Sequence, residues 1–546
     1  MRLKDVVDER MAGGDRAILK TVRKWKTALG SFSAFFFRSE VCRGADVPVY
    51  AVMGLPRGEG PFPGILHYHG GGQTANPELV ELLVRQGYAA ISFDWTGPRE
   101  NREHVTRWHG CVPRYSGMEP DESLLIRALT AGRQALTILA EHPRVDSARL
   151  GQFGISWGGF QTWLLNAMDN RLRAAVAMYG CGITRSQALS YFTDELKLQR
   201  NFDPEAWLER FNPINYASDQ QAPVLFLNGT NDFFGWMNTF RRLAGRLDER
   251  HRAAFAPHLN HAIGTLNPTF LAWLNGHLRG GGFPGQPIVS GKWTRHGVEL
   301  RSAALSHAKS AVFYVASAHD VGPDSFWMPV VAQRSGGYFT ARIAAAALSS
   351  RQVLVYAHQH SAHGIETSSF PLHLTGTPRP APVFEGGPLP LTSDLWYGPA
   401  SVDPLCPFIP LRPHPLRNGN GPAWKTASDL NFSFNTRVVA LTRYCPRTGA
   451  YFRCRLHGPV TDPVIVAVLQ FAGSPRERHF QGGFSRVALA RGVPLGTLKD
   501  SRDDSLPAGT PLSHLCICGT TQRPGTVRLE AAEIVRSTNK GSTLCL

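Results

Sequence analysis

Residues 151–160 read GQFGISWGGF, and the sequence around this stretch decides the fold class of the chain. In a chain with 54 glycines a G-x-S-x-G pattern can arise by chance, so its neighbours must be considered. RLGQFGIS is typical of a buried strand and WGGFQTWLL of a helix. Ser156 is therefore expected at a sharp strand-to-helix turn, which small residues two positions away allow to form without collisions. We interpret Ser156 as a candidate nucleophile.

Short apolar runs alternate with helical patterns from about residue 31 to residue 280. GILHYHGGG, AAISFDW, RAAVAMYG and PVLFLNGTND are typical of strands. NPELVELLVRQG is typical of a helix that Asn76 caps, Pro77 begins and Gly87 ends. This alternation predicts an α/β fold with a doubly wound, mostly parallel sheet, preceded by an antiparallel pair formed by SFSAFFF and VPVYAVMGLP.

The pattern changes after the linker RGGGFPGQP, where short alternating apolar runs indicate β-sandwich material. We therefore expect an N-terminal helical segment over 1–30 and an α/β catalytic domain over 31–286. One or two all-β domains follow, a β-sandwich over 287–376 and a second, jelly-roll-like domain over 377–546. Because the candidate catalytic residues precede the linker, a protein ending near residue 286 is expected to keep the chemistry.

A serine hydroxyl is a weak nucleophile, so it needs a base that takes its proton and an acid that orients the base. Asp232 follows the strand PVLFLNGTND and is the candidate acid. His261 lies beyond the next strand, in FAPHLNHAIG, and is the candidate base. Asp219, before the strand, and Asp248, on a helix expected to face solvent, are the alternative acids. His258 is the alternative base.

The segment HYHGGG, residues 67–72, ends an early strand with three glycines. Bare backbone there can approach a substrate carbonyl closely, so the amides of Gly71 and Gly72 could form an oxyanion hole with the amide of Trp157. A glycine-rich turn without a catalytic role is the alternative. His69 is expected to be a buried structural histidine.

HYHGGG, GISWGG, NGTNDFF and LNHA, in that order between residues 67 and 262, resemble the α/β-hydrolase superfamily. The resemblance is strongest to its dienelactone-hydrolase-like and acetyl xylan esterase-like branches. It extends to the prolyl-oligopeptidase catalytic domain, in which an aromatic residue and two glycines follow the nucleophile. It implies that Ser156, Asp232 and His261 are nucleophile, acid and base, and that Trp157 contributes an amide.

The expected activity is hydrolysis of a carboxylic ester through an acyl-enzyme, with deacetylation of a carbohydrate as its most specific form. No metal or organic cofactor is needed. Dienelactone hydrolases use a cysteine nucleophile, and prolyl oligopeptidases carry a β-propeller before the hydrolase domain, so the chain departs from both patterns. A serine peptidase or amidase is the first alternative. A binding or scaffold protein with a vestigial hydrolase domain is the second.

Composition bounds the partners and the location of the chain. The net charge of +16 comes from scattered residues without a nucleic-acid-binding signature, so a nucleic-acid partner is not expected. Nine cysteines without paired spacing describe neither a disulfide framework nor a zinc site. The N-terminus lacks the apolar core of a signal peptide and no run is long enough to span a membrane, which predicts a cytoplasmic protein, or a secreted one if the native N-terminus is longer.

Substrate selection is expected to depend on the loop over 94–120 and on an insertion over 183–217. Trp396, Tyr397 and Trp424 in the last domain could stack on sugar rings, with core or turn packing as the alternative. The oligomeric state is not indicated by the sequence.

Overall fold

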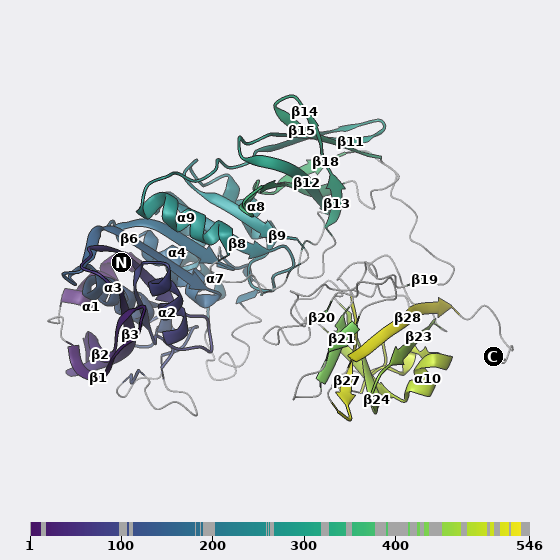
Figure 1. Ribbon diagram of the computed structural model, residues 1–546, viewed down its shortest axis with the longest axis horizontal. Coiled ribbons are helices and arrows are strands. Elements are labelled where there is room, and N and C mark those ends of the chain that lie inside the picture. Colours follow the sequence, from purple (N-terminus) through teal and green to yellow (C-terminus); the bar gives the residue numbers. More distant parts are fainter. Residues whose placement is uncertain are drawn as a thin grey trace.

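The computed structural model describes most of the first 376 residues and parts of the remainder (Figure 1). The described residues are 2–12, 18–97, 106–108, 113–180, 182–185, 187–188, 202–257, 259, 261, 267–317, 321, 327–344, 352–376, 389–390, 413–414, 423–425, 431–435, 450–470, 478–499, 503–506, 514–523 and 526–536. His258, Trp396 and Tyr397 lie outside them. None of the described helices has the length and apolar composition needed to span a membrane.

A mostly parallel sheet forms the centre of the first part of the chain, in the strand order β1-β2-β3-β5-β4-β6-β7-β8-β9. The first four strands in this order pair antiparallel, and the strands from β5 to β9 pair parallel. Every residue of β5 and β8 is buried, as expected for parallel strands covered on both faces. The bounds are β1 Ile18–Lys26, β2 Gly30–Cys42, β3 Ala45–Pro56, β4 Phe62–Tyr68, β5 Ala89–Phe93, β6 Val145–Ile155, β7 Leu172–Met178, β8 Val224–Gly229 and β9 Arg252–Ala256.

Helices cover both faces of this sheet, as strand β6 shows. A side chain at Gly151 would meet Leu278 of helix α9, whereas the next residue, Gln152, donates a hydrogen bond to the Thr162 carbonyl in helix α4. Successive residues of a strand point to opposite faces, so α9 and α4 lie on opposite sides. The doubly wound α/β fold predicted from the sequence is therefore present. The helices are α1 Leu3–Ala12, α2 Pro77–Arg85, α3 Leu124–Ala140, α4 Trp157–Asn166, α7 Pro204–Phe211, α8 Met237–Ala244 and α9 Pro268–Leu278, with the 3-10 helix η1 at Pro213–Asp219.

The N-terminal segment corrects one prediction. Helix is predicted over 1–30, but α1 ends at Ala12 and residues Ile18–Lys26 form the edge strand β1, paired with β2. Trp25 stacks on Phe32 of β2 with ring centroids 5.5 Å apart, and the lysines of β1 are exposed. Strand pairing with an existing apolar sheet outweighs the weak local helix signal, and the exposed charges suit an edge strand.

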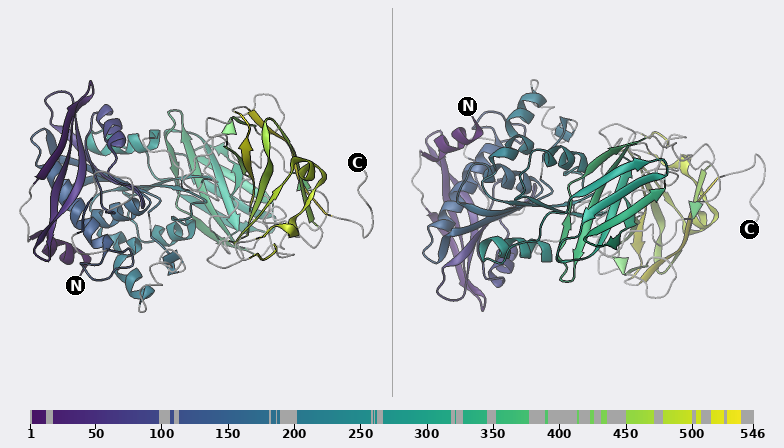
Figure 2. Two further views of the ribbon diagram at one scale, coloured as in Figure 1. Left: turned by 90° about the horizontal axis from the view of Figure 1, so that it is seen from below. Right: turned by 90° about the horizontal axis from the view of Figure 1, so that it is seen from above.

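The sheet continues past the predicted boundary at residue 287. Strand β17 pairs antiparallel with β9 through Ser368 and Ala253, and β16, β12, β13 and β18 extend the sheet to fourteen strands. A second sheet has the order β10-β11-β15-β14 and belongs to the strand-rich part drawn in teal and green (Figure 2). The two sheets share a buried core that includes Leu300, Phe313 and Val355. These two sheets form a sandwich. The bounds are β10 Val289–Thr294, β11 Gly297–Ala303, β12 Ala308–Ser317, β13 Met328–Val331, β14 Gln333–Ser335, β15 Tyr338–Ala344, β16 Gln352–Ser361, β17 Glu366–Ser368 and β18 Leu372–Thr375.

The described residues after 388 form two further sheets, one of order β20-β21-β28-β23-β26 with β19 beside β28, the other of order β22-β27-β24-β25. Their common core includes Phe452, Val466, Ile517 and Val527, so this part is also strand-rich with a core of its own. Trp424 lies in β21. The bounds are β19 Leu389–Pro390, β20 Pro413–His414, β21 Ala423–Lys425, β22 Asn431–Asn435, β23 Ala450–His457, β24 Val460–Gln470, β25 Arg478–Phe484, β26 Val493–Pro494, β27 His514–Thr521 and β28 Thr526–Arg536, with helix α10 at Arg486–Arg491.

The buried His251, directly before β9, is expected to make the free energy of unfolding depend on pH. Its ring is buried, and Nδ1 accepts a hydrogen bond from the Val224 backbone N–H at 3.1 Å. Burial lowers the pKa of His251 to about 4. The pKa of a histidine in an unfolded chain is about 6.5. As pH falls from that range toward 4, the unfolded state takes up a proton that the folded state does not, and the free energy of unfolding falls.

Replacing His251 by Asn is expected to flatten this pH dependence, because the Asn oxygen can accept the Val224 N–H without titrating. The slope of the unfolding free energy should become shallower by up to about 1.4 kcal/mol per pH unit, the value for one proton. Urea denaturation at several pH values between 7 and 4 measures it. The exposed His296, replaced by Asn, is the matched control. An unchanged slope in His251→Asn would contradict the assignment.

Candidate active site

Ser156 occupies a strained turn between strand β6 and helix α4. Its backbone has φ 60° and ψ −123°, in a region that a residue with a side chain rarely adopts. Such strain costs about 1 to 3 kcal/mol and persists only where the surroundings hold it. The Ser156 N–H donates to the Met178 carbonyl at 2.9 Å, and its carbonyl accepts from the Phe160 N–H at 3.0 Å. The strand-to-helix turn predicted at this serine is therefore present.

Two glycines make this turn possible by close approach of the backbone. A side chain at Gly158 would collide with the carbonyl oxygens of Tyr68 and His69, at the end of the neighbouring strand β4. A side chain at Gly154 would collide with the Gly158 carbonyl. Glycine is needed at both positions because the turn packs too closely against the neighbouring backbone to leave room for a side chain.

Asp232 and His261 are brought together by the loops that follow β8 and β9. One carboxylate oxygen of Asp232 lies 2.5 Å from Nδ1 of His261. The other accepts backbone hydrogen bonds from Phe234 at 2.7 Å and Gly235 at 2.5 Å, which fixes the carboxylate. The Asp232 side chain is fully buried and that of His261 is 7% exposed. An imidazole held at Nδ1 in this way presents Nε2 as a base.

The alternative acids have other surroundings. Asp219 is exposed at the end of η1, and Asp248 is paired with Arg250 at 2.8 Å. Nδ1 of His261 contacts Asp232 rather than either of these. The alternative base His258 lies outside the described residues.

His261 and Ser156 share neighbouring residues. The His261 ring lies against Tyr179, with centroids 4.0 Å apart, and Tyr179 directly follows Met178, whose carbonyl holds the Ser156 amide. Tyr179 also has positive φ, at 65°. Phe234 lies 5.0 Å from the ring of Trp157 and 6.4 Å from that of His261. The imidazole and the serine turn therefore lie at the same edge of the sheet.

The glycine loop after β4 reaches this edge as well. A side chain at Gly71 would meet the Trp157 indole at 2.7 Å and the Tyr115 hydroxyl at 3.2 Å, so the loop backbone lies against the residue that follows Ser156. Gly72 has φ 84°. His69 is fully buried, and its Nε2 accepts from the Trp95 N–H at 3.2 Å, so it has the structural role expected.

An aromatic wall beside the serine was not predicted from the sequence. The Trp157 ring contacts the rings of Tyr115 at 4.6 Å, Phe160 at 5.2 Å and Phe234 at 5.0 Å. The Tyr115 carbonyl in turn accepts a hydrogen bond from the indole N–H of Trp207, in α7. The available signal was that Tyr115 and Trp207 fall in the two segments expected to govern substrate selection, 94–120 and 183–217.

Two protein-family models match the chain. The acetyl xylan esterase (AXE1) family matches residues 33–197, which contain the glycine loop and the serine turn. The prolyl oligopeptidase family matches residues 133–278, which contain Ser156, Asp232 and His261. The two matches overlap at the serine turn. Together they cover residues 33–278, from within strand β2 to the end of helix α9.

Curated relatives each match part of the chain. The uncharacterized peptidase YuxL of Bacillus subtilis is 29% identical over 187 residues, 32% of this chain and 26% of that protein. A putative carboxymethylenebutenolidase of Methylorubrum extorquens is 29% identical over 188 residues, 34% of this chain and 56% of that protein. Acyl-coenzyme A thioesterase 5 of Mus musculus is 24% identical over 249 residues, 41% of this chain and 54% of that protein. The matches thus span from about a quarter to about half of these relatives.

Solved structures similar to this chain include acetyl xylan esterase 1 from Thermoanaerobacterium sp. JW/SL YS485, with 17% identity, 48% of this chain and 88% of that chain covered, and a TM-score of 0.41. A putative dienelactone hydrolase from Klebsiella pneumoniae is 22% identical, with 42% of this chain and 88% of that chain covered and a TM-score of 0.31. Residues 33–278 therefore have the α/β-hydrolase fold and are similar in sequence to the acetyl xylan esterase and prolyl oligopeptidase families.

Proposed function

We propose that this protein is a serine hydrolase that cleaves carboxylic esters, with Ser156 as nucleophile, His261 as base and Asp232 as acid. The observation that carries the proposal is the buried Asp232–His261 pair at the same sheet edge as the strained Ser156 turn. A chance serine on a turn would have no reason to lie at the same sheet edge as an imidazole oriented by a buried carboxylate.

The reaction proceeds in two halves. Ser156 Oγ attacks the ester carbonyl carbon while His261 Nε2 takes the hydroxyl proton, and Asp232 stabilises the imidazolium. The tetrahedral intermediate expels the alcohol, which receives that proton from His261, and leaves an acyl-enzyme. Water then attacks the acyl carbonyl, His261 again accepts and returns a proton, and the acid leaves. The Trp157 amide, at the N-terminus of α4, and the amides of Gly71 and Gly72 are the proposed donors to the oxyanion.

The substrate is proposed to be a small acyl ester, with an acetylated carbohydrate as its most specific form. The partly buried rings of Tyr115 and Trp157, next to the serine turn, support this proposal, because aromatic faces pack against sugar rings and short apolar acyl groups. The match to the acetyl xylan esterase family supports it as well. The prolyl oligopeptidase match and the Bacillus subtilis relative favour a peptidase as the second candidate.

A substrate panel distinguishes these candidates. Purified full-length protein is incubated with short acyl esters, acetylated xylo-oligosaccharides, an acyl thioester and peptide anilides, and initial rates are compared. The proposal expects turnover of esters, with acetylated sugars among the best substrates. Faster cleavage of peptide anilides than of any ester would favour the peptidase. Turnover of no substrate, together with no labelling by a fluorophosphonate, would favour a non-catalytic protein.

Replacing Asp232 by Asn is expected to lower kcat by about 10⁴-fold, because an amide at this position holds the imidazole in the wrong tautomer. The side chain keeps its shape, so the backbone N–H groups of Phe234 and Gly235 retain an acceptor. Asp219→Asn, at an exposed carboxylate before β8, is the matched control and should leave kcat unchanged. Steady-state ester hydrolysis measures both, and a folded Asp232→Asn protein with kcat within tenfold of the native value would exclude Asp232 as the acid.

A further inference from the structure

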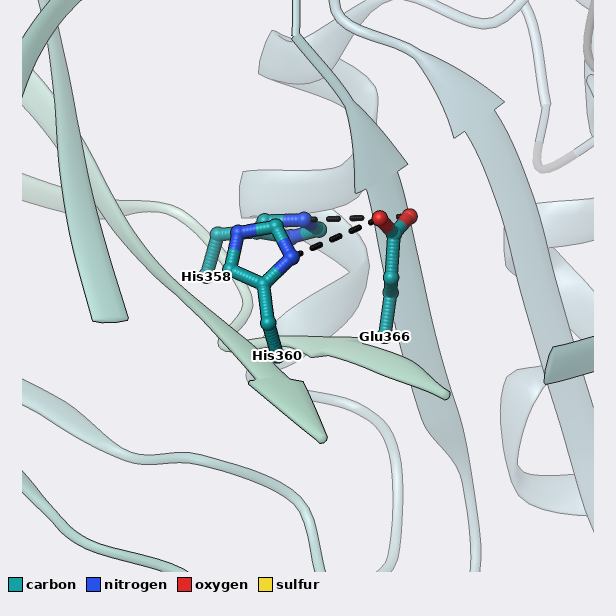
Figure 3. A group of neighbouring side chains, drawn as sticks. All are labelled: His358, His360 and Glu366. Atoms are coloured by element: carbon teal, nitrogen blue, oxygen red, sulfur yellow. Dashed lines mark ion pairs between the residues drawn. The ribbon is translucent and has the colours of Figure 1, made fainter. Parts of the chain in front are cut away.

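Two histidines and a glutamate lie close together on the hairpin of β16 and β17. His358 and His360 are two residues apart on β16, so they share one face of the sheet. The antiparallel register places Glu366 opposite His360 and Ser368 opposite His358. Figure 3 shows the two imidazoles directed at the Glu366 carboxylate.

The spacing of the three side chains suits a metal ion. His360 Nδ1 lies 3.4 Å from one Glu366 oxygen, and His358 Nε2 lies 3.8 Å from the other. One ligand atom from each residue lies within 4.8 Å of those of the other two. Tetrahedral zinc with bonds of about 2.0 to 2.1 Å has its ligand atoms about 3.3 Å apart, so small side-chain movements complete the geometry.

His358 is held in the way expected of a metal ligand. Its Nδ1 lies 2.7 Å from Ser368 Oγ, which also accepts the Phe255 N–H at 2.9 Å. When Nδ1 donates its proton to Ser368, the lone pair of Nε2 faces Glu366, and Nε2 is buried without a hydrogen-bond partner among the described residues. A lone pair directed at a carboxylate is repelled unless a cation lies between them.

We propose that His358, His360 and Glu366 bind one divalent transition-metal ion, Zn²⁺ or an ion of similar preference. Two imidazoles and a carboxylate suit such an ion better than Mg²⁺ or Ca²⁺, which prefer oxygen ligands alone. The His360 and Glu366 side chains are 36% and 46% exposed, so a water molecule can take the fourth position. The contact of His358 Nδ1 with Ser368 Oγ holds the imidazole in the orientation needed for binding the ion.

The position of the site indicates a structural role. Its ligands lie on the hairpin of β16 and β17, and β17 pairs with β9. This hairpin therefore joins the β region, which we define as strands β10 to β18 (residues 289–375), to the hydrolase sheet, which we define as strands β1 to β9. The Glu366 N–H donates to Thr269 Oγ1 at 2.9 Å, in the first turn of α9. A bound ion therefore fastens β16 and β17 where they meet both the sheet and this helix. The ion takes no part in the proposed ester hydrolysis, for which no metal is needed.

The test uses metal-free full-length protein titrated with Zn²⁺ against a chromophoric chelator. The native protein should bind one Zn²⁺ at this site. His360→Ala and Glu366→Gln, at partly exposed positions, should each weaken the affinity for Zn²⁺ by at least about tenfold to a hundredfold. Replacing residues that only orient a metal ligand already has effects of that size. His296→Ala, at an exposed histidine on the turn after β10, is the matched control and should bind like the native protein.

Thermal unfolding supplies a second readout, because an ion that binds the folded protein raises Tm. Zn²⁺ should raise Tm of the native protein and of His296→Ala, and should leave that of His360→Ala unchanged. Equal Zn²⁺ affinity in the native protein and His360→Ala would overturn the site, as would native protein that binds no Zn²⁺. Tight binding without any rise in Tm would overturn the structural role.

Discussion

A Ser156→Ala protein is expected to fold normally and to hydrolyse esters about 10⁶-fold more slowly than the native protein. The change removes only the hydroxyl, so the proposed nucleophile is lost while the Asp232–His261 pair remains. Alanine keeps the Cβ that serine already places at φ 60°, so the turn gains no new collision. The unfolding temperature should therefore stay close to the native value.

Covalent labelling makes this prediction specific to one serine. A fluorophosphonate should label the native protein once and should not label Ser156→Ala. Ser218→Ala, at an exposed serine in η1, is the matched control and should keep both labelling and turnover. Undiminished ester hydrolysis by a folded Ser156→Ala protein would exclude the mechanism.

The serine turn was predictable from the sequence because its causes are local. A buried strand, glycines on both sides and an apolar helix lie within a few residues of Ser156, and each constrains the same backbone turn. The contact between Asp232 and His261 was predictable for a related reason. Parallel strands end at one edge of a sheet, so loops that follow β8 and β9 meet there whatever their internal conformation.

Features that depend on register between distant strands were not predictable. The Tyr115 ring contacts Trp157 at the start of helix α4 from a loop whose sequence carries no periodic signal. The histidines of β16 face Glu366 only because the hairpin has this register, and a shift by one residue would turn them to the other face. The pairing of β17 with β9 could not be predicted either, because the segment RGGGFPGQP is typical of a linker between separate domains.

That pairing changes the expected behaviour of a protein ending near residue 286. Phe255 of β9 is fully buried, with its ring 5.7 Å from Tyr356 and 6.4 Å from Phe370. The Phe255 N–H donates to Ser368 Oγ at 2.9 Å. The hydrolase sheet and the β region therefore share an apolar core, which also contains Tyr314, Trp327 and Leu354 from the β region.

We expect a protein ending at residue 286 to be aggregated or largely unfolded. The linker sequence alone had suggested that residues 31–286 fold and act without the strands that follow. Each large apolar side chain left exposed costs about 1.5 to 3 kcal/mol, and a domain has only about 5 to 15 kcal/mol of stability in total. Removing the β region also leaves β9 as an unpaired edge, which favours aggregation. Size-exclusion chromatography and thermal unfolding measure the outcome.

A protein ending at residue 376 is the matched comparison, because it keeps β10 to β18 and the shared core. It should be monodisperse and hydrolyse a small ester at the native rate. If residues 377–546 capture a polymeric substrate, this shorter protein should lose activity on the polymer alone, since a tethered weak site raises the effective substrate concentration. Equal rates on both substrates would exclude that role. A monodisperse, active protein ending at residue 286 with native Tm would show instead that the shared core contributes little to the stability of the hydrolase sheet.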